Sequence, residues 1–202
     1  MASTPSTATG VGSTDSRWHL LAAATRTERA WKNGAGTTAD VVVFPPGASD
    51  TTFAWRVSIA TITGSSAFSL FPGVDRWLVP LDAPGLALLI GGHRRQVPDG
   101  TAVAFAGEET VNSLDGDHTS KDLNLMVRRG AATGTVRIET VQGVRAVTAA
   151  EGSTVVVVVI DGALLLGGQL PVRRHDALFL SGGTSLALFG EARVAIIEVT
   201  VT

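Results

Sequence analysis

The sequence predicts an all-β protein, a fold class indicated by its composition and by the pattern of its apolar residues. Hydrophobic residues make up 45% of the 202 residues and charged residues 17%, below the roughly 25% charged residues of an average soluble protein. The 23 glycines and 8 prolines are typical of many turns between buried strands. No window of ten or more residues repeats apolar side chains at the helical period, although residues 18–30 are compatible with a turn or two of helix.

The expected strands are short apolar runs bounded by Gly, Pro, Asp or Asn. In the first two thirds of the chain they cover residues 39–44, 53–62, 77–81, 86–90, 101–105 and 123–127. In the last third they cover residues 136–139, 155–160, 163–166, 177–180, 185–189 and 194–201. A strand about every ten residues predicts a β-sandwich or β-barrel with few short helices.

Two stretches of the chain echo each other and predict two copies of one unit. The sequence LALLIGG of residues 86–92 returns 76 residues later as GALLLGG in residues 162–168. Residues 99–107 are echoed at a similar offset by residues 176–183, each a turn, a strand and a second turn. We expect a disordered tail over residues 1–16, a first unit over residues 17–130 and a second, mainly structural unit over residues 131–202, with exchange of strands between the units allowed.

Charge and composition exclude several classes of function. A formal net charge of −2, with Lys32 and Lys121 as the two lysines, gives no basic surface for nucleic acid. The longest apolar runs fall far short of the ~20 residues of a membrane-spanning helix, and residues 1–16 lack the apolar centre of a secretory signal. Together with the absence of cysteine, these features predict a cytoplasmic protein with no nucleic-acid or membrane partner.

The polar residues match no common catalytic or metal-binding motif. The four histidines, His19, His93, His118 and His175, lack the close spacing that places two imidazoles on one metal ion. The sequence also has no Gly-x-Ser-x-Gly motif and no glycine-rich phosphate loop with its lysine. It therefore predicts no metal, no cofactor and no catalytic triad.

Two predicted strands carry polar residues on one face. In residues 53–60, alternation places Arg56 and Ser58 opposite Trp55 and its apolar neighbours. The arginine either reaches solvent or points into a barrel, where its donors suit a carboxylate. Alternation in residues 122–128 places Asn124 on the face opposite Leu123 and Leu125, so Arg56 and Asn124 could line one cavity.

Two loops add candidate residues, each with a structural alternative. In residues 31–37 the amide of Asn33 and the glycines around it either hold a ligand carbonyl or carboxylate or form a capped turn. Residues 67–77 contain a Pro-Gly turn followed by Asp75 and Arg76, which either orient a ligand or brace the loop. Phe68 in that loop belongs to the core, to a pocket wall or to both.

Four ordered motifs resemble the HutD/Ves family: WKNGAGT at residues 31–37, WRVS at 55–58, FSLFPGVDR at 68–76 and DLNLM at 122–126. The resemblance is strong over residues 18–129 and weaker to the C-terminus. It implies a double-cupin fold, two small β-barrels in one chain, with a metal-free pocket. Ala35 replaces a usual glycine and Leu123 stands where phenylalanine is common, two mild departures that bear on the ligand more than on the fold.

The resemblance implies a role in bacterial histidine utilisation. Family members are thought to bind an early catabolite, such as urocanate or formylglutamate, and to moderate the output of the pathway, with no established reaction. By motif, Arg56 is the implied carboxylate anchor. The implied ligand-binding residues are Arg56, Asn33, Ser58, Phe68, Asn124, Asp75 and Arg76. The expected partner is a small carboxylate metabolite.

Two other functions stay open. One is a metal-independent enzyme that acts on a small carboxylate, with Asp75 as general base. The other is an interaction or scaffold module, in which residues 194–201 form an exposed sheet edge that pairs with a second copy of the chain as a homodimer.

Overall fold

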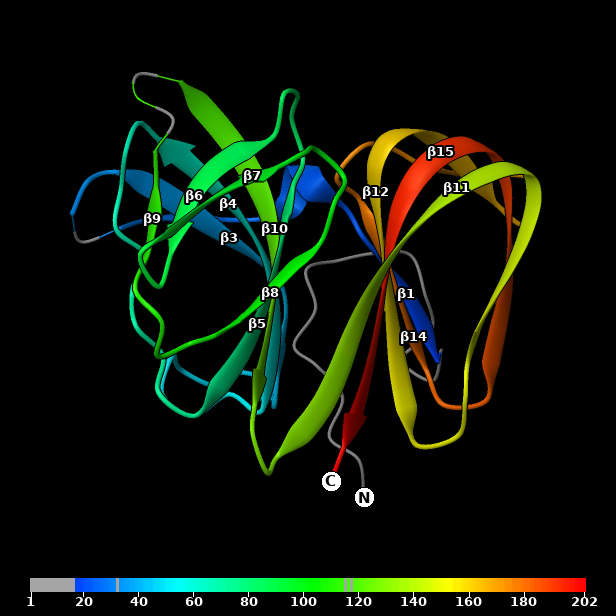
Figure 1. The fold of residues 1–202 in the computed structure, drawn as a ribbon. Helices are drawn as coiled ribbons and strands as arrows, with labels where there is room; N and C mark the ends of the chain where they lie inside the picture. The colour runs from blue at the N-terminus through cyan, green and yellow to red at the C-terminus, as the bar shows by residue number, and fades with distance from the viewer. Residues whose placement is uncertain (1–16, 32, 115, 117) are drawn as a thin grey trace. The chain divides into compact units, whose positions relative to one another are not determined.

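The chain is built from β-strands, as Figure 1 shows for this computed structural model, which describes residues 17–31, 33–114, 116 and 118–202. The helical content of this part is one 3₁₀ turn, η1 (Ala23–Thr25). The predicted all-β class is therefore confirmed, and residues 18–30 form two short strands on either side of that turn. No helix in the described part is long and apolar enough to span a membrane. The predicted tail over residues 1–16 lies outside the described residues.

The strands fall into three sheets, one of six strands in each of two compact units and one of three strands. The first ten strands are β1 (Trp18–Leu21), β2 (Glu28–Ala30), β3 (Gly36–Phe44), β4 (Trp55–Thr63), β5 (Val74–Pro80), β6 (Leu86–Ile90), β7 (His93–Val97), β8 (Val103–Ala106), β9 (Val111–Ser113) and β10 (Thr119–Arg128). The remaining strands are β11 (Ala132–Ala149), β12 (Ser153–Leu166), β13 (Leu170–Val172), β14 (Ala177–Ser181) and β15 (Thr184–Val201).

One unit comprises residues 27–131 and is a sandwich of two sheets. The six-stranded sheet has the order β2-β3-β4-β10-β5-β8, and the three-stranded sheet has the order β7-β6-β9. A shared apolar cluster joins them, with Ile62, Leu78 and Phe105 from the larger sheet. Leu86 and Leu88 of β6 contribute from the smaller sheet and are fully buried. This cluster lies on the same face of the larger sheet as the pocket described below.

The other unit combines residues 17–26 with residues 132–202. Its sheet begins with β1, which pairs antiparallel with β14 and lies beside it in Figure 1. Trp18 and Leu20 pack against the apolar core of this unit. The sequence placed residues 17–26 in the first unit. The structure assigns them to the second, because Trp18 and Leu20 are partly buried against the core of that unit.

Long strands that bend at glycines allow this single sheet to curve around its own core. Gly162 and Gly190 have φ angles of 81° and 135°. A Cβ at Gly162 would overlap the carbonyl oxygen of Glu191, and a Cβ at Gly190 would lie 2.7 Å from the carbonyl oxygen of Ala163. Glycine is therefore required at these two positions, where the backbones of the paired strands β12 and β15 approach closely.

Two expectations about sheet edges need correction. Neither six-stranded sheet closes on itself in the described part of the chain, because the outermost strands of each sheet are not paired with each other. The sheets are therefore open, and the described residues form no closed barrel. Residues 194–201 belong to β15, which pairs with β11 on one side and β12 on the other. The outer strands along this sheet are β1 and β11, so the predicted exposed C-terminal edge is wrong.

The echo in the sequence corresponds to a hairpin with a Gly-Gly pair at its turn in both units. Gly91 and Gly92 alone connect β6 to β7, whereas Gly167, Gly168 and Gln169 connect β12 to β13. All four glycines have positive φ angles between 55° and 82°. In the β6–β7 hairpin, a two-residue turn with positive φ at both positions matches the twist of the strands on either side. The β12–β13 turn is one residue longer but keeps the two glycines at its start.

Candidate functional site

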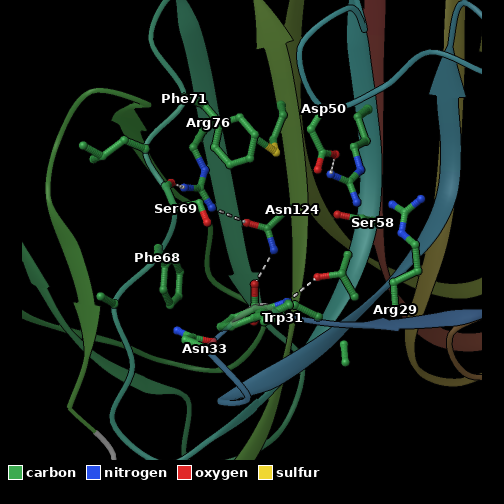
Figure 2. Close-up of a pocket in the computed structure, with 18 residues that line it drawn as sticks. Arg29, Trp31, Asn33, Asp50, Ser58, Phe68, Ser69, Phe71, Arg76 and Asn124 are labelled. Atoms are coloured by element: carbon green, nitrogen blue, oxygen red, sulfur yellow. Dashed lines mark hydrogen bonds and ion pairs between the residues drawn. The ribbon is translucent and has the colours of Figure 1, made fainter.

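A pocket of about 570 Å³ opens on the larger sheet of the 27–131 unit (Figure 2). Arg56, Ser58 and Ala60 of β4 line it, together with Asp122, Asn124 and Met126 of β10. Each set occupies alternate positions on its strand, so all six side chains point to one face.

The strand register places two arginines on either side of one methionine. Met126 lies opposite Arg56 on β4 and opposite Arg76 on β5. Asn124 lies opposite Ser58 in the same ladder. Residues directly opposite each other share a face of the sheet, so the register brings both arginines into the pocket.

Arg56 is held by two carboxylates of the protein itself. Its Nε donates to Oδ1 of Asp40 at 2.6 Å, and its Nη1 donates to Oδ1 of Asp50 at 2.9 Å. Arg29 also pairs with Asp40, at 2.7 Å. Arg56 is 6% exposed, and its positive charge is compensated before any ligand arrives.

Arg76 is a buried cation without a carboxylate at ion-pair distance among the described residues. Its Nη1 and Nη2 donate to the backbone oxygen of Ser69 and to Oδ1 of Asn124, both at 3.3 Å, and its Nε has no partner. The residue is 7% exposed. Burial lowers the pKa of Arg76 to about 10, so it stays charged at neutral pH. Arg76 therefore differs from Arg56, whose guanidinium already pairs with two carboxylates.

Aromatic rings surround the guanidinium of Arg76. Its central carbon lies 5.5, 5.6 and 5.0 Å from the ring centroids of Phe68, Phe71 and Phe105. The ring of Trp31 meets that of Phe68 edge-on at 6.1 Å. This wall lowers the local dielectric and strengthens any ionic interaction made by Arg76.

Asp122 lies deep in the pocket and is 1% exposed. Its Oδ2 accepts a hydrogen bond from Nδ2 of Asn124, and its Oδ1 has no partner among the described residues. Burial raises the pKa of Asp122 to about 7, against the opposing effects of Asn124 and Arg76. Our sequence interpretation overlooked Asp122, although its alternation with Asn124 already placed both side chains on one face.

Asn33 combines the two roles considered for its loop. Its Oδ1 accepts a hydrogen bond from the backbone of Ala35 at 3.1 Å, which caps the turn. Its Nδ2 donates to Oγ of Ser66 at 3.3 Å, and the residue lines the pocket. The glycine-rich loop therefore both forms a capped turn and supplies part of the pocket rim.

Asp75 is the one predicted site residue that does not line the pocket. Its side chain is 47% exposed, and its Oδ1 accepts from Nη1 of Arg129 at 2.6 Å. Neighbours on a strand point to opposite faces, so Arg76 points into the pocket while Asp75 lies on the outer surface and pairs with Arg129.

The other predicted ligand-binding residues all line the pocket: Arg56, Asn33, Ser58, Phe68, Asn124 and Arg76. In the described part of the chain, no group of three His, Asp or Glu side chains could hold a metal ion.

Solved structures resemble the whole fold. HutD from Pseudomonas fluorescens SBW25 superposes with a TM-score of 0.78 at 26% identity, covering 92% of this chain and 99% of that one. A conserved protein of unknown function from Pseudomonas aeruginosa PAO1 gives a TM-score of 0.77 at the same identity and coverage. A cupin 2 conserved barrel domain protein from Leptotrichia buccalis, 11% identical, gives a TM-score of 0.55 over 87% of this chain and 92% of its own. The fold is therefore cupin-like.

Sequence comparison identifies the family. Protein Ves from Citrobacter koseri is 36% identical over 178 residues, which cover 84% of this chain and 87% of that protein. Protein Ves from Cronobacter sakazakii is 33% identical over 173 residues, covering 84% and 92%. The family model described as HutD matches residues 23–197. By this match and these identities, the chain belongs to the HutD family.

Proposed function

We propose that this chain binds a small carboxylate metabolite in the pocket of its 27–131 unit and thereby moderates histidine utilisation. The observation that carries the proposal is Arg76, a buried guanidinium that lacks a carboxylate at ion-pair distance in the described structure. An uncompensated buried charge is costly. A carboxylate is the small group whose geometry suits the donors of arginine.

The aromatic walls favour a ligand with a flat or apolar body. Trp31, Phe68 and Phe71 line the pocket beside the polar floor formed by β4 and β10. Ligand pockets commonly pair such walls with a few polar groups that fix orientation. Urocanate and formylglutamate are the two candidates that family membership suggests.

We also infer that the two units are two cupin-like halves of one chain. The matching Gly-Gly hairpins of β6–β7 and β12–β13 support this, as does the cupin-like fold. Only the 27–131 unit would then carry the ligand site, and the other unit would be structural.

The proposal is tested by calorimetric titration of urocanate and of formylglutamate into the wild-type protein and into Arg76→Gln. We expect saturable binding of at least one ligand to the wild type. The loss of a charge-assisted contact of about 1.5–3 kcal/mol predicts affinity about 10- to 100-fold weaker in the variant. Arg137→Gln, which changes an exposed arginine of β11, is the control and should bind as the wild type does.

A parallel titration with Arg56→Gln separates the two arginines. Because Arg56 already pairs with Asp40 and Asp50, this variant should weaken binding less than Arg76→Gln does. If Arg56→Gln weakened binding more than Arg76→Gln does, Arg56 would be the residue that anchors the ligand carboxylate. Failure of the folded wild type to bind either ligand, checked by circular dichroism, would contradict the proposal.

A further inference from the structure

The charges around the pocket fall into two groups. Arg29 and Arg56 are joined by ion pairs to Asp40 and Asp50, two cations with two anions. This group is neutral as a whole and sits on the side of the pocket formed by β2, β3 and β4. The other group consists of Arg76 on β5 and Asp122 on β10.

Arg76 and Asp122 are connected through one amide. Asn124 accepts from Nη2 of Arg76 with its Oδ1 and donates to Oδ2 of Asp122 with its Nδ2, as the dashed lines in Figure 2 show. The charges of Arg76 and Asp122 are close enough to interact, but the two described side chains make no direct ion pair. Each keeps one buried polar atom that has no partner within the described structure, Nε of Arg76 and Oδ1 of Asp122.

The neighbours of Asp122 supply no other compensating charge. Directly opposite it lie Ala60 on β4 and Pro80 on β5, neither of which ionises. Of the charged groups that line the pocket, Arg29 on β2 and Arg56 on β4 are engaged with Asp40 and Asp50. The charge that favours ionised Asp122 is that of Arg76.

We propose that Asp122 determines specificity in this pocket: it balances Arg76 while the pocket is empty and takes up one proton when a carboxylate binds to Arg76. The inference rests on the proposed function. One negative charge replaces another, so the pocket accepts a monocarboxylate without a change in net charge. A dicarboxylate such as formylglutamate would leave a surplus negative charge in a low-dielectric space, which carries an energetic cost, so the inference selects urocanate from the two candidate ligands.

Burial prepares Asp122 for this exchange. Because burial raises its pKa to about 7, a proton can be gained near neutral pH. A second negative charge at Arg76 raises the pKa further. Above pH 7 binding must include protonation of Asp122, so affinity falls by about tenfold per pH unit. Below pH 7 the carboxyl group is already neutral, and the dependence disappears.

The experiment uses 3-(2-furyl)acrylate, a planar monocarboxylate that titrates only at its carboxyl group. Calorimetric titrations at pH 8 in phosphate and in Tris, whose ionisation enthalpies differ, measure the protons exchanged on binding. We expect uptake of about one proton by the wild type and a loss of affinity of about 50-fold between pH 7 and pH 9. Binding without proton uptake would overturn the inference and leave the proposed function intact.

Asp122→Asn removes the titrating group at nearly constant shape. We expect this variant to bind furylacrylate without proton uptake and with equal affinity across pH 7–9. Asp161→Asn, which changes an exposed residue of β12, should keep the wild-type pH dependence. If Asp122 had only a structural role, its replacement would not remove the proton uptake, which is measured as the difference in binding enthalpy between the two buffers. If Asp122→Asn fails to fold, the wild-type titrations alone decide whether a proton is taken up on binding.

A comparison of ligand charge completes the test. At pH 8 the planar dicarboxylate trans,trans-muconate should bind at least about tenfold more weakly than furylacrylate. Equal or tighter binding of muconate would overturn the selection for a monocarboxylate. If furylacrylate, muconate, urocanate and formylglutamate all fail to bind the folded wild type, the proposed function fails, and this inference fails with it.

Discussion

Replacement of Leu88 by alanine is expected to lower the free energy of unfolding by about 2–5 kcal/mol. Leu88 lies in the middle of β6, is fully buried and packs in the cluster that joins the two sheets of the 27–131 unit. The truncated side chain leaves a cavity that neighbouring strands, fixed by their hydrogen bonds, fill only in part. Urea unfolding followed by tryptophan fluorescence measures the loss as a shift in midpoint.

Leu70→Ala is the matched control, since it removes the same atoms from a side chain that is 54% exposed in the same unit. It should change the free energy of unfolding by about 0.5 kcal/mol or less. Equal losses in the two variants would mean that the cluster between the sheets does not carry the stability we assign to it.

Gly107→Ala is expected to cost about 3–4 kcal/mol, the sum of overpacking and of weakened backbone hydrogen bonds. The backbone of Gly107 donates to the carbonyl of Val74 at 2.7 Å and accepts from the amide of Phe71 at 2.8 Å. A Cβ at this position would overlap the carbonyl oxygen of Phe71 and lie 2.8 Å from that of Val74. The methyl group must therefore push the 68–74 loop outward.

This displacement should reach the pocket, because Phe71 lines it. Carboxylate affinity is expected to fall together with stability, and both can be measured on one preparation by urea unfolding and calorimetric titration. Gly73→Ala is the control: its φ is 77° but no atom lies within 4 Å of the added Cβ, so it should cost about 1–2 kcal/mol of backbone strain. A smaller loss in Gly107→Ala than in Gly73→Ala would contradict the steric argument.

Strand alternation allowed much of the pocket to be predicted from sequence. A period of two places Arg56 and Ser58 on one face, and the same rule applied to residues 122–128 places Asn124 on a matching face. The observed register sets Asn124 opposite Ser58, so the two faces are one surface. Alternation depends only on local chain geometry, which is why sequence alone suffices for it.

The charge partners of the arginines depend on long-range register and were not predictable in the same way. Asp40 reaches Arg56 from β3, where the pairing with β4 shifts by one residue between Asp40 and Val42. Asp50 reaches it from the loop between those strands. No local pattern reports such contacts, so the sequence could not distinguish Arg56, which makes direct ion pairs, from Arg76, which makes none among the described residues.

The pairing of β1 with β14 has a consequence for synthesis on the ribosome. Leu21 ends β1, and its partner strand begins at Ala177, after the entire 27–131 unit has been made. At 5–20 residues per second, the delay between the two strands is on the order of 10–30 s. The middle unit can fold during that interval, whereas Trp18 and Leu20 must wait in the nascent chain without their core. β1 is therefore translated before the 27–131 unit but is expected to become structured after it.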